Sequence, residues 1–321
     1  MGDVDIFNGD ADGICALVQL RQFDPRSARL ITGMKRDIAL VNRANVRRGD
    51  RITILDVSFD RNRDGVLEAI ESGASIFYCD HHFSGDLPSH PALQTLINTS
   101  SGVCTSVLIN GYLKSRYSAW AAVGAFGDNL SDTACEILKS LSYKKSQLDL
   151  LKKLGIYMNY NSYGMDISDL NLHPADLYRA LASFESPLDF VSESPEYFQK
   201  LETSYHSDFE KVLSIVPQYT DSKVAVYFLP NKSWSRRISG MFSNQLANET
   251  PSRAHAVLTE RNEGDFLVSV RAPISNRKGA DILCRQFVTG GGRSCGTGLQ
   301  LRDGTTEVYT NSTARFLSGE G

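Results

Sequence analysis

The chain has 321 residues, of which 41% are hydrophobic, a formal net charge of -3 and a pI near 6.1. This composition is typical of a globular protein with room for two domains. The slight negative charge excludes a positive field over the whole molecule, so we expect no long duplex DNA as a partner. The longest apolar run, at 119–126, is too short to span a bilayer, and we expect no membrane association.

Cysteine usage indicates a reducing compartment. The six cysteines lie at positions 15, 79, 104, 135, 284 and 295, and no two of them form a CxxC pair. This spacing favours free thiols over a disulfide framework or a structural zinc site. The acidic start of the chain, at 1–5, shows no basic and apolar targeting signal. We therefore expect a cytoplasmic protein.

The first half of the chain alternates short β-like runs with helical patterns, as a parallel sheet covered by helices does. The expected strands are 4–7, 30–33, 52–57 and 76–79, with helices at 14–23 and 65–72 between them. Further helices are expected at 105–113, at 119–126, from near Ser131 and from near Ser146, continuing to about 182. The pattern predicts a doubly wound α/β domain.

A second, smaller α/β unit is expected after a segment rich in Ser, Pro and Glu at 185–196 and a helix at 197–212. Its strands are predicted at 223–228, 255–258 and 266–271, with a helix at 237–247 and a glycine-rich loop at 290–298. We predict a catalytic domain at 1–185, a connector with a helix at 186–219 and a substrate-binding domain at 220–321. The active site is expected in the cleft between the two domains.

Carboxylate and imidazole side chains cluster where the expected strands end. The turn Asn8-Gly9-Asp10-Ala11-Asp12-Gly13 follows the first strand, and Asp80-His81-His82 follows the fourth. Asp56 lies inside an otherwise buried strand pattern, where an uncompensated charge would be costly unless a metal ion neutralised it. Oxygen and nitrogen ligands together suit divalent metals such as manganese. The cluster indicates metal-assisted phosphate chemistry.

Each of these features also has a purely structural interpretation. An acidic turn is common, two adjacent histidines can be satisfied surface residues, and Asp128 in Gly127-Asp128-Asn129 can serve as a cap or loop residue at the end of an apolar helix. Only the complete set separates the two interpretations.

The ordered set resembles the DHH phosphoesterase superfamily, which includes RecJ-like exonucleases, nanoRNases, dinucleotide phosphodiesterases, exopolyphosphatases and manganese pyrophosphatases. The turn at 8–13, Asp56, Asp80-His81-His82 and Asp128 resemble its four motifs in order. Near the C-terminus, Val268-Ser269-Val270-Arg271 followed by Gly290-Gly291-Gly292 resembles the associated DHHA1 substrate domain. The resemblance covers most of the chain.

The resemblance implies a site with two Mn²⁺ ions, for which Mg²⁺ or Co²⁺ can substitute. It implies that Asp56 bridges the ions, that Asp10 binds the first, and that the second is bound by Asp12, His81 and Asp128. It further implies that Asp80 orients a neighbour, and that His82 contacts the scissile phosphate or protonates the leaving oxygen. The implied substrate-binding residues are Arg271, Gly290, Gly291, Gly292 and Arg293.

Three positions depart from the family pattern. Ile6 stands where many members have a histidine, and Asn8 stands where the exonuclease-like members have another carboxylate. Arg293 follows the glycines where histidine is usual, and its guanidinium could clamp a phosphate or stack on a base. Lys35 and Arg36, after the second expected strand, could line the cleft, although nothing in their spacing demands it.

We expect a manganese-dependent phosphodiesterase that cuts short RNA or linear dinucleotides such as pGpG or pApA into nucleoside monophosphates. The alternatives are a cyclic-dinucleotide phosphodiesterase, a phosphoadenosine phosphate phosphatase, a single-strand exonuclease and a nucleotide sensor that has lost catalysis. The departures at Ile6 and Asn8 are what favour the sensor. A homodimer is compatible with the sequence. The sequence does not predict which bases the enzyme prefers or from which end it cuts.

Overall fold

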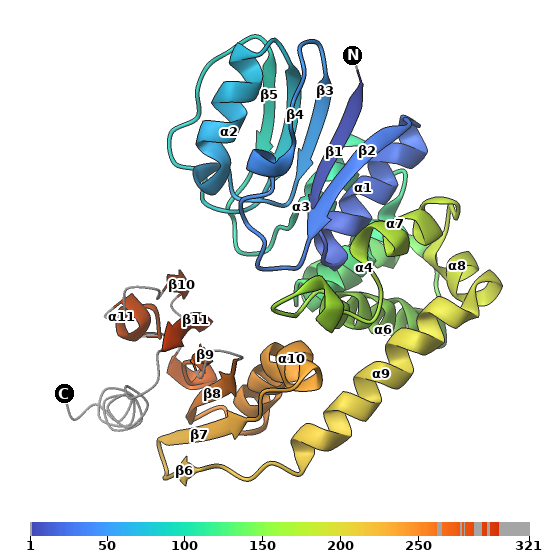
Figure 1. Ribbon diagram of the computed structural model, residues 1–321. Coiled ribbons are helices and arrows are strands. Elements are labelled where there is room, and N and C mark those ends of the chain that lie inside the picture. Colours follow the sequence, from blue (N-terminus) through green and yellow to red (C-terminus); the bar gives the residue numbers. More distant parts are fainter. Residues whose placement is uncertain are drawn as a thin grey trace. The chain divides into compact units, whose positions relative to one another are not determined.

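The computed structural model describes residues 2–261, 265–276, 278, 280–285, 291–293 and 296–301. The chain divides into two compact units, unit 1 at Met1–Thr203 and unit 2 at Ser204–Gly321 (Figure 1). The boundary falls inside the long helix α9 (Pro195–Leu213). The predicted boundaries at 185 and 219, and the predicted cleft, stay predictions.

A five-stranded parallel sheet forms the centre of unit 1 (Figure 1). Its strands are β1 (Asp3–Asn8), β2 (Ala28–Gly33), β3 (Arg51–Leu55), β4 (Ser75–Asp80) and β5 (Leu93–Ile97), in the spatial order β2-β1-β3-β4-β5. The direction of winding reverses at β1, which confirms the predicted doubly wound α/β fold. Strand β5 was not predicted, because its pattern of half-buried and exposed side chains includes the polar residues Gln94 and Thr95.

Helices cover both faces of this sheet. The helices of unit 1 are α1 (Ala11–Phe23), α2 (Phe59–Glu71), α3 (Thr105–Tyr112), α4 (Ser118–Gly127), α5 (Ser131–Leu138), α6 (Lys145–Asn161), α7 (Pro174–Ala182), α8 (Pro187–Glu193) and the first part of α9. Of these, α1, α2, α3 and α7 make the main contacts with the strands. On one face, Phe59 and Val66 of α2 join a buried apolar cluster with Ile6 and Ile54 of the strands. On the other, Arg21 of α1 forms a buried ion pair with Asp5 of β1. Alternate residues of β1 therefore face α2 and α1.

Two glycines allow the backbone to approach closely around the start of α1. A Cβ atom at Gly9 would lie 2.0 Å from the carbonyl oxygen of Gly33, and one at Gly127 would lie 2.3 Å from the Cβ of Ala11. Neither position has room for a side chain, so β2, α4 and the turn after β1 meet at van der Waals distance. This packing brings the acidic turn close to the end of α4.

The segment rich in Ser, Pro and Glu at 185–196, where the sequence predicts the start of a connector, contains the helix α8. Ser186 caps it by accepting a hydrogen bond from the Leu188 amide, and Pro187 occupies its first turn. Both residues are typical of a helix start. Phe190 of this helix is fully buried, so the segment belongs to the packed part of unit 1.

Unit 2 contains a six-stranded mixed sheet in the order β10-β11-β9-β8-β7-β6. Its elements are β6 (Tyr219–Thr220), β7 (Val224–Leu229), α10 (Ser233–Glu249), β8 (Ala254–Glu260), β9 (Phe266–Arg271), α11 (Ala280–Arg285), β10 (Gly291–Arg293) and β11 (Gly296–Leu301). Strands β7 and β8 are parallel, and the other pairs are antiparallel. A buried apolar cluster joins β7, β8 and β9 to α11, so this is the second, smaller α/β unit that the sequence predicts.

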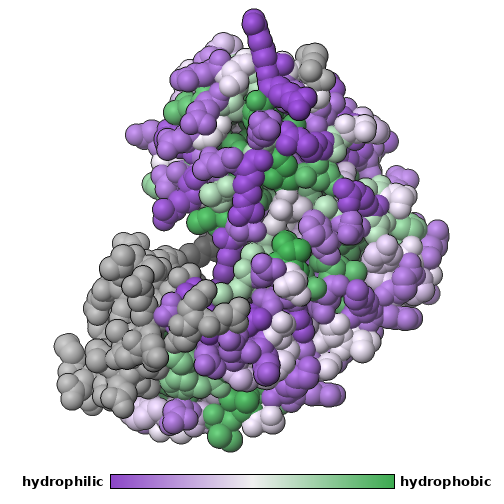
Figure 2. All heavy atoms as spheres, viewed as in Figure 1, coloured by the Kyte–Doolittle hydropathy of each residue, from purple (hydrophilic) through white to green (hydrophobic). Residues whose placement is uncertain are grey.

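Hydrophilic side chains cover most of the face shown in Figure 2, with apolar side chains in smaller groups among them. None of the helices in the described residues is long and apolar enough to cross a membrane.

Candidate metal centre

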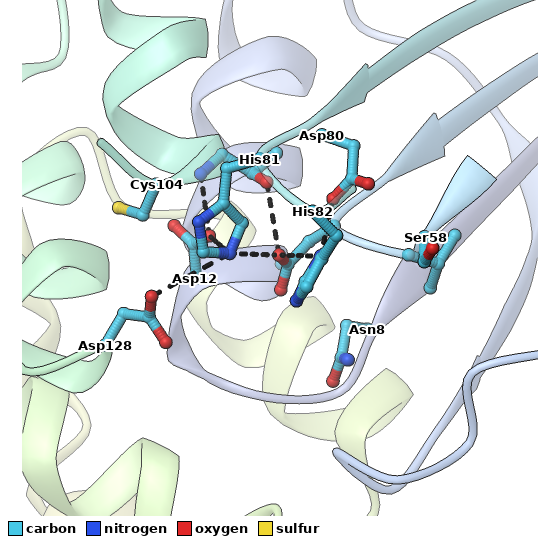
Figure 3. A network of polar contacts seen from close by, with 12 residues as sticks. Asn8, Asp12, Ser58, Asp80, His81, His82, Cys104 and Asp128 are labelled. Carbon is cyan, nitrogen blue, oxygen red and sulfur yellow. Dashed lines mark hydrogen bonds and ion pairs between the residues drawn. The ribbon is translucent and has the colours of Figure 1, made fainter. Parts of the chain in front are cut away.

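The motif residues of unit 1 meet at the carboxyl edge of the parallel sheet. Asp10 and Asp12 open α1 after β1, Asp56 follows β3 directly, and Asp80 ends β4. Figure 3 shows how the labelled members of the group face one another. The complete group is Asp10, Asp12, Asp56, Asp80, His81, His82 and Asp128. His82 and Asp128 are partly exposed, and the other members are buried.

The imidazole of His81 lies at the centre of three carboxylates (Figure 3). Its Nε2 atom is 3.5 Å from Asp56 Oδ1, 3.8 Å from Asp128 Oδ2 and 4.0 Å from Asp12 Oδ2. Its Nδ1 atom lies 3.0 Å from the backbone oxygen of Val103. Because a carbonyl oxygen can only accept a hydrogen bond, Nδ1 carries a proton and donates a hydrogen bond to this oxygen. The Nε2 atom thereby faces the carboxylates, as in a histidine that binds a metal.

The backbone holds Asp12 in place from the start of α3. The amides of Thr105 and Ser106 donate hydrogen bonds of 2.7 Å to its two carboxylate oxygens. The N-terminal end of a helix favours an anion, because its amides are unpaired and its dipole is positive there.

Asp56 adopts a backbone conformation that is uncommon for residues other than glycine, with φ of 60°. Its amide donates to the carbonyl of Cys79, and its Oδ1 accepts a hydrogen bond of 3.1 Å from the Thr105 hydroxyl. Residues held in the left-handed region concentrate at functional sites. The turn directs the carboxylate of Asp56 toward His81.

Asp80 and His82 form a second pair beside this group. His82 Nδ1 lies 2.7 Å from Asp80 Oδ1 and 4.0 Å from Asp56 Oδ1. Burial favours the neutral ring, but the hydrogen bond to Asp80 and the charge of Asp56 outweigh it and raise the pKa of His82 above its ordinary value. Asp80 is thus in position to orient His82, as the resemblance implies.

Lys35, which the sequence analysis named as a residue that could line the cleft, lies within the metal centre itself. It follows the carboxyl end of β2, and its Nζ atom lies 2.5 Å from Asp10 Oδ2, 3.0 Å from Asn159 Oδ1 and 3.4 Å from Asp128 Oδ1. Burial would raise the pKa of Asp10, but the ammonium group outweighs it and lowers the pKa to about 2. The sequence does contain one sign of this position: Lys35 follows a predicted parallel strand, so it lies at the same edge of the sheet as the acidic residues.

Four of the predicted ligands fit a divalent cation. Asp12, Asp56, His81 and Asp128 offer oxygen and nitrogen donors of the kind that manganese accepts. Burial, together with the carboxylates of Asp10 and Asp12, raises the pKa of Asp56 well above its ordinary value. Ligand atoms of Asp56, His81 and His82 also lie within 4.8 Å of one another. A cation here would relieve the repulsion between buried carboxylates.

The predicted substrate-binding residues belong to unit 2. Arg271 ends β9, and its Nε donates a hydrogen bond of 2.8 Å to Asn244 Oδ1. Gly291, Gly292 and Arg293 form β10, whereas Gly290 lies outside the described residues. Their role in substrate binding stays a prediction.

Comparison with known proteins gives structural likenesses only. No protein-family model matches the chain, and no curated protein does. Among solved structures, RecJ of Thermus thermophilus in complex with Mn²⁺ matches with a TM-score of 0.67 and 13% identity over 99% of this chain and 52% of the RecJ chain. This chain therefore spans about half the length of that RecJ.

Two further likenesses cover most of both chains. The DHH domain of a protein described as a member of a family of ribosomal proteins matches with a TM-score of 0.67 and 14% identity, over 98% of this chain and 86% of that one. The pGpG-specific phosphodiesterase PggH of Vibrio cholerae matches with a TM-score of 0.56 and 12% identity over the full length of both.

The chain thus shares the fold of RecJ, of that DHH domain and of PggH, and the resemblance found in its motifs is confirmed at the level of the fold.

Proposed function

We propose that the protein is a divalent-metal-dependent phosphodiesterase that hydrolyses short oligonucleotides or linear dinucleotides to nucleoside monophosphates. The observation that carries the proposal is the convergence of Asp12, Asp56 and Asp128 on the Nε2 atom of His81. The manganese in the RecJ structure and the pGpG specificity of PggH support it by analogy of fold.

The residues of the centre have distinct tasks in this reaction. A divalent cation, when bound, neutralises the phosphate and acts as a Lewis acid. Asp12 and His81 are held rigidly by backbone groups, which preserves the ligand geometry during turnover. His82 is oriented through its Nδ1 by Asp80, so its Nε2 is the atom from which a proton passes to the leaving oxygen. The raised pKa of His82 keeps that proton available near neutral pH.

An exposed aromatic ring beside the centre favours a nucleotide over an inorganic phosphate chain as substrate. Phe83 follows His82 directly, and 73% of its surface is exposed. Its backbone oxygen accepts a hydrogen bond of 3.0 Å from the Ser58 hydroxyl, which fixes the backbone beneath the ring. Aromatic rings in such positions stack on nucleic acid bases.

The test is hydrolysis of 5'-phosphorylated dinucleotides by the purified protein with Mn²⁺. We expect release of monophosphates by the wild type, loss of release in His81→Ala, and full activity in Asp149→Asn, which neutralises an exposed aspartate of α6. Release no greater than that of His81→Ala would exclude the proposed function.

Substrates of other kinds separate the alternatives within the same assay. Faster cleavage of two-nucleotide than of twenty-nucleotide substrates supports an oligonucleotidase over a single-strand exonuclease. Parallel assays with a cyclic dinucleotide and with phosphoadenosine phosphate test the two remaining enzymes.

A nucleotide sensor is the second candidate, and the position of Lys35 favours it. The Lys35 ammonium group contacts Asp10, the residue expected to bind the first metal ion. A sensor would bind dinucleotides without turnover and without a requirement for Mn²⁺, which calorimetry in the presence and absence of a chelator distinguishes from the enzyme.

A further inference from the structure

We propose that the centre holds one divalent cation, bound by Asp12, Asp56, His81 and Asp128, and that the Lys35 ammonium group takes the place of a second cation beside Asp10. The inference deepens the proposed function and rests on its metal centre. It replaces the two ions that the family resemblance implies by one ion and one fixed side-chain charge.

The ammonium group of Lys35 has a complete set of acceptors. It carries three N–H donors, and three oxygens lie within hydrogen-bonding distance, at 2.5 Å on Asp10, 3.0 Å on Asn159 and 3.4 Å on Asp128. Asp10 in turn has both oxygens in use. Its Oδ1 accepts the amides of Asp12 and Gly13 at the start of α1, and its Oδ2 accepts Lys35. Asp10 thus acts as a helix cap and as the partner of a lysine.

The backbone of Lys35 is fixed on both sides. Its amide donates a hydrogen bond of 3.0 Å to the Ser162 carbonyl, and its carbonyl accepts one of 3.3 Å from Asn8 Nδ2. Ser162 and Asn159 lie at the C-terminal end of α6, where the helix dipole favours a positive charge. The ring of Tyr163, 6.0 Å from Nζ, adds a cation–π contact. The structure therefore contains a built position for this ammonium group.

Both departures at the first-cation position agree with this arrangement. Asn8 anchors the Lys35 backbone through an amide N–H, which an aspartate could not donate. Ile6, at the position of a family histidine, lies in the buried apolar cluster on the sheet and offers no ligand. Ile6 and Asn8 therefore provide no charged ligand for a first cation, and Asn8 instead holds the backbone of Lys35.

The remaining four ligands stay directed at a common point. Asp128 uses Oδ1 for Lys35 and turns Oδ2 toward His81 Nε2, at 3.8 Å. Asp12 and Asp56 direct oxygens to the same nitrogen. Asp128 thus lies between the ammonium group and the proposed cation, and it neutralises part of the charge of each.

The test is the Mn²⁺ content of the wild-type chain, measured without substrate by calorimetric titration and by low-temperature electron paramagnetic resonance. We expect one equivalent of Mn²⁺ and the spectrum of an isolated ion. Two equivalents with an exchange-coupled spectrum would overturn the inference.

Three variants give an independent readout. Asp10→Asn preserves the helix cap, because asparagine also accepts the two amides, and we expect it to keep one equivalent, whereas His81→Ala loses it. Lys35→Gln removes a neighbouring positive charge, and we expect it to bind the ion more tightly by about tenfold or more. Loss of Mn²⁺ from Asp10→Asn, or unchanged or weaker binding in Lys35→Gln, would contradict the inference.

The inference and the proposed function fail in different ways. One bound ion without dinucleotide hydrolysis would exclude the enzyme and leave the role of Lys35 intact. Hydrolysis with two bound ions would confirm the enzyme and exclude that role.

Discussion

Asp56 allows a quantitative test of the strain in the metal-free centre. The Oδ1 atom of Asp56 is 3.5 Å from His81 Nε2, and the Oδ2 atom of Asp12 is 4.0 Å from the same nitrogen. The two carboxylate oxygens therefore cannot be further apart than the sum of these distances. Two like charges about 7 Å apart, at an effective dielectric constant of about 20, repel each other by about 2 kcal/mol. Asparagine keeps the size of the side chain, accepts the Thr105 hydroxyl and tolerates a positive φ. We expect Asp56→Asn to raise the free energy of unfolding of the metal-free protein by about 2 kcal/mol.

Urea unfolding at neutral pH, with chelator and with Mn²⁺, measures both sides of this effect. At a Mn²⁺ concentration a hundredfold above its Kd, the wild type should gain about 2.7 kcal/mol, and Asp56→Asn should gain nothing. Asp149→Asn, an exposed substitution in the same unit, should behave as the wild type. If Asp56→Asn is less stable than the wild type without metal, or is stabilised by Mn²⁺ to the same extent, the reasoning is wrong.

Three further predictions concern other parts of the chain. Asp5→Ala leaves the Arg21 guanidinium buried without its carboxylate, and we expect chemical denaturation to show a loss of about 3 to 5 kcal/mol, most of which the double variant Asp5→Leu, Arg21→Met recovers. Phe83→Ala should raise the KM for dinucleotides by a factor corresponding to about 1 to 3 kcal/mol and leave kcat nearly unchanged, whereas equal kinetics would exclude stacking. Burial and the charge of Arg253 lower the pKa of His255 to about 4. Because the unfolded state takes up the proton first as pH falls from 6.5 to about 4, stability should fall by up to about 3 kcal/mol over that range. His255→Phe should lack this part of the pH dependence in urea titrations.

The sequence predicted the elements whose signal is local. The buried strand β4 contains the apolar run at 76–79, and β1 and β3 are mostly apolar with single polar residues, Asp5 and Thr53, inside them. The acidic and histidine motifs directly follow these strands or end them. Parallel strands place their carboxyl ends at one edge, so local motifs predicted a common site. Strand β5 was missed because a half-exposed edge strand needs few apolar residues.

The role of Lys35 depends on tertiary contacts that no local pattern contains. Its side-chain partners lie 25, 93 and 124 residues away along the chain. Its backbone partner Ser162 belongs to the end of a helix whose placement depends on the packing of α4 and α6. A lysine after a strand is therefore ambiguous until the fold is known.

The long sequence span of the centre has a consequence for protein synthesis. Asp12 is held by amides 93 and 94 residues further along the chain, and Asp128 comes later still. A nascent chain carries its first carboxylates long before the segment that orients them has left the ribosome. If the centre binds a cation as proposed, the complete ligand set exists only after about two fifths of the polypeptide has emerged, and metal loading then reports that this part has folded.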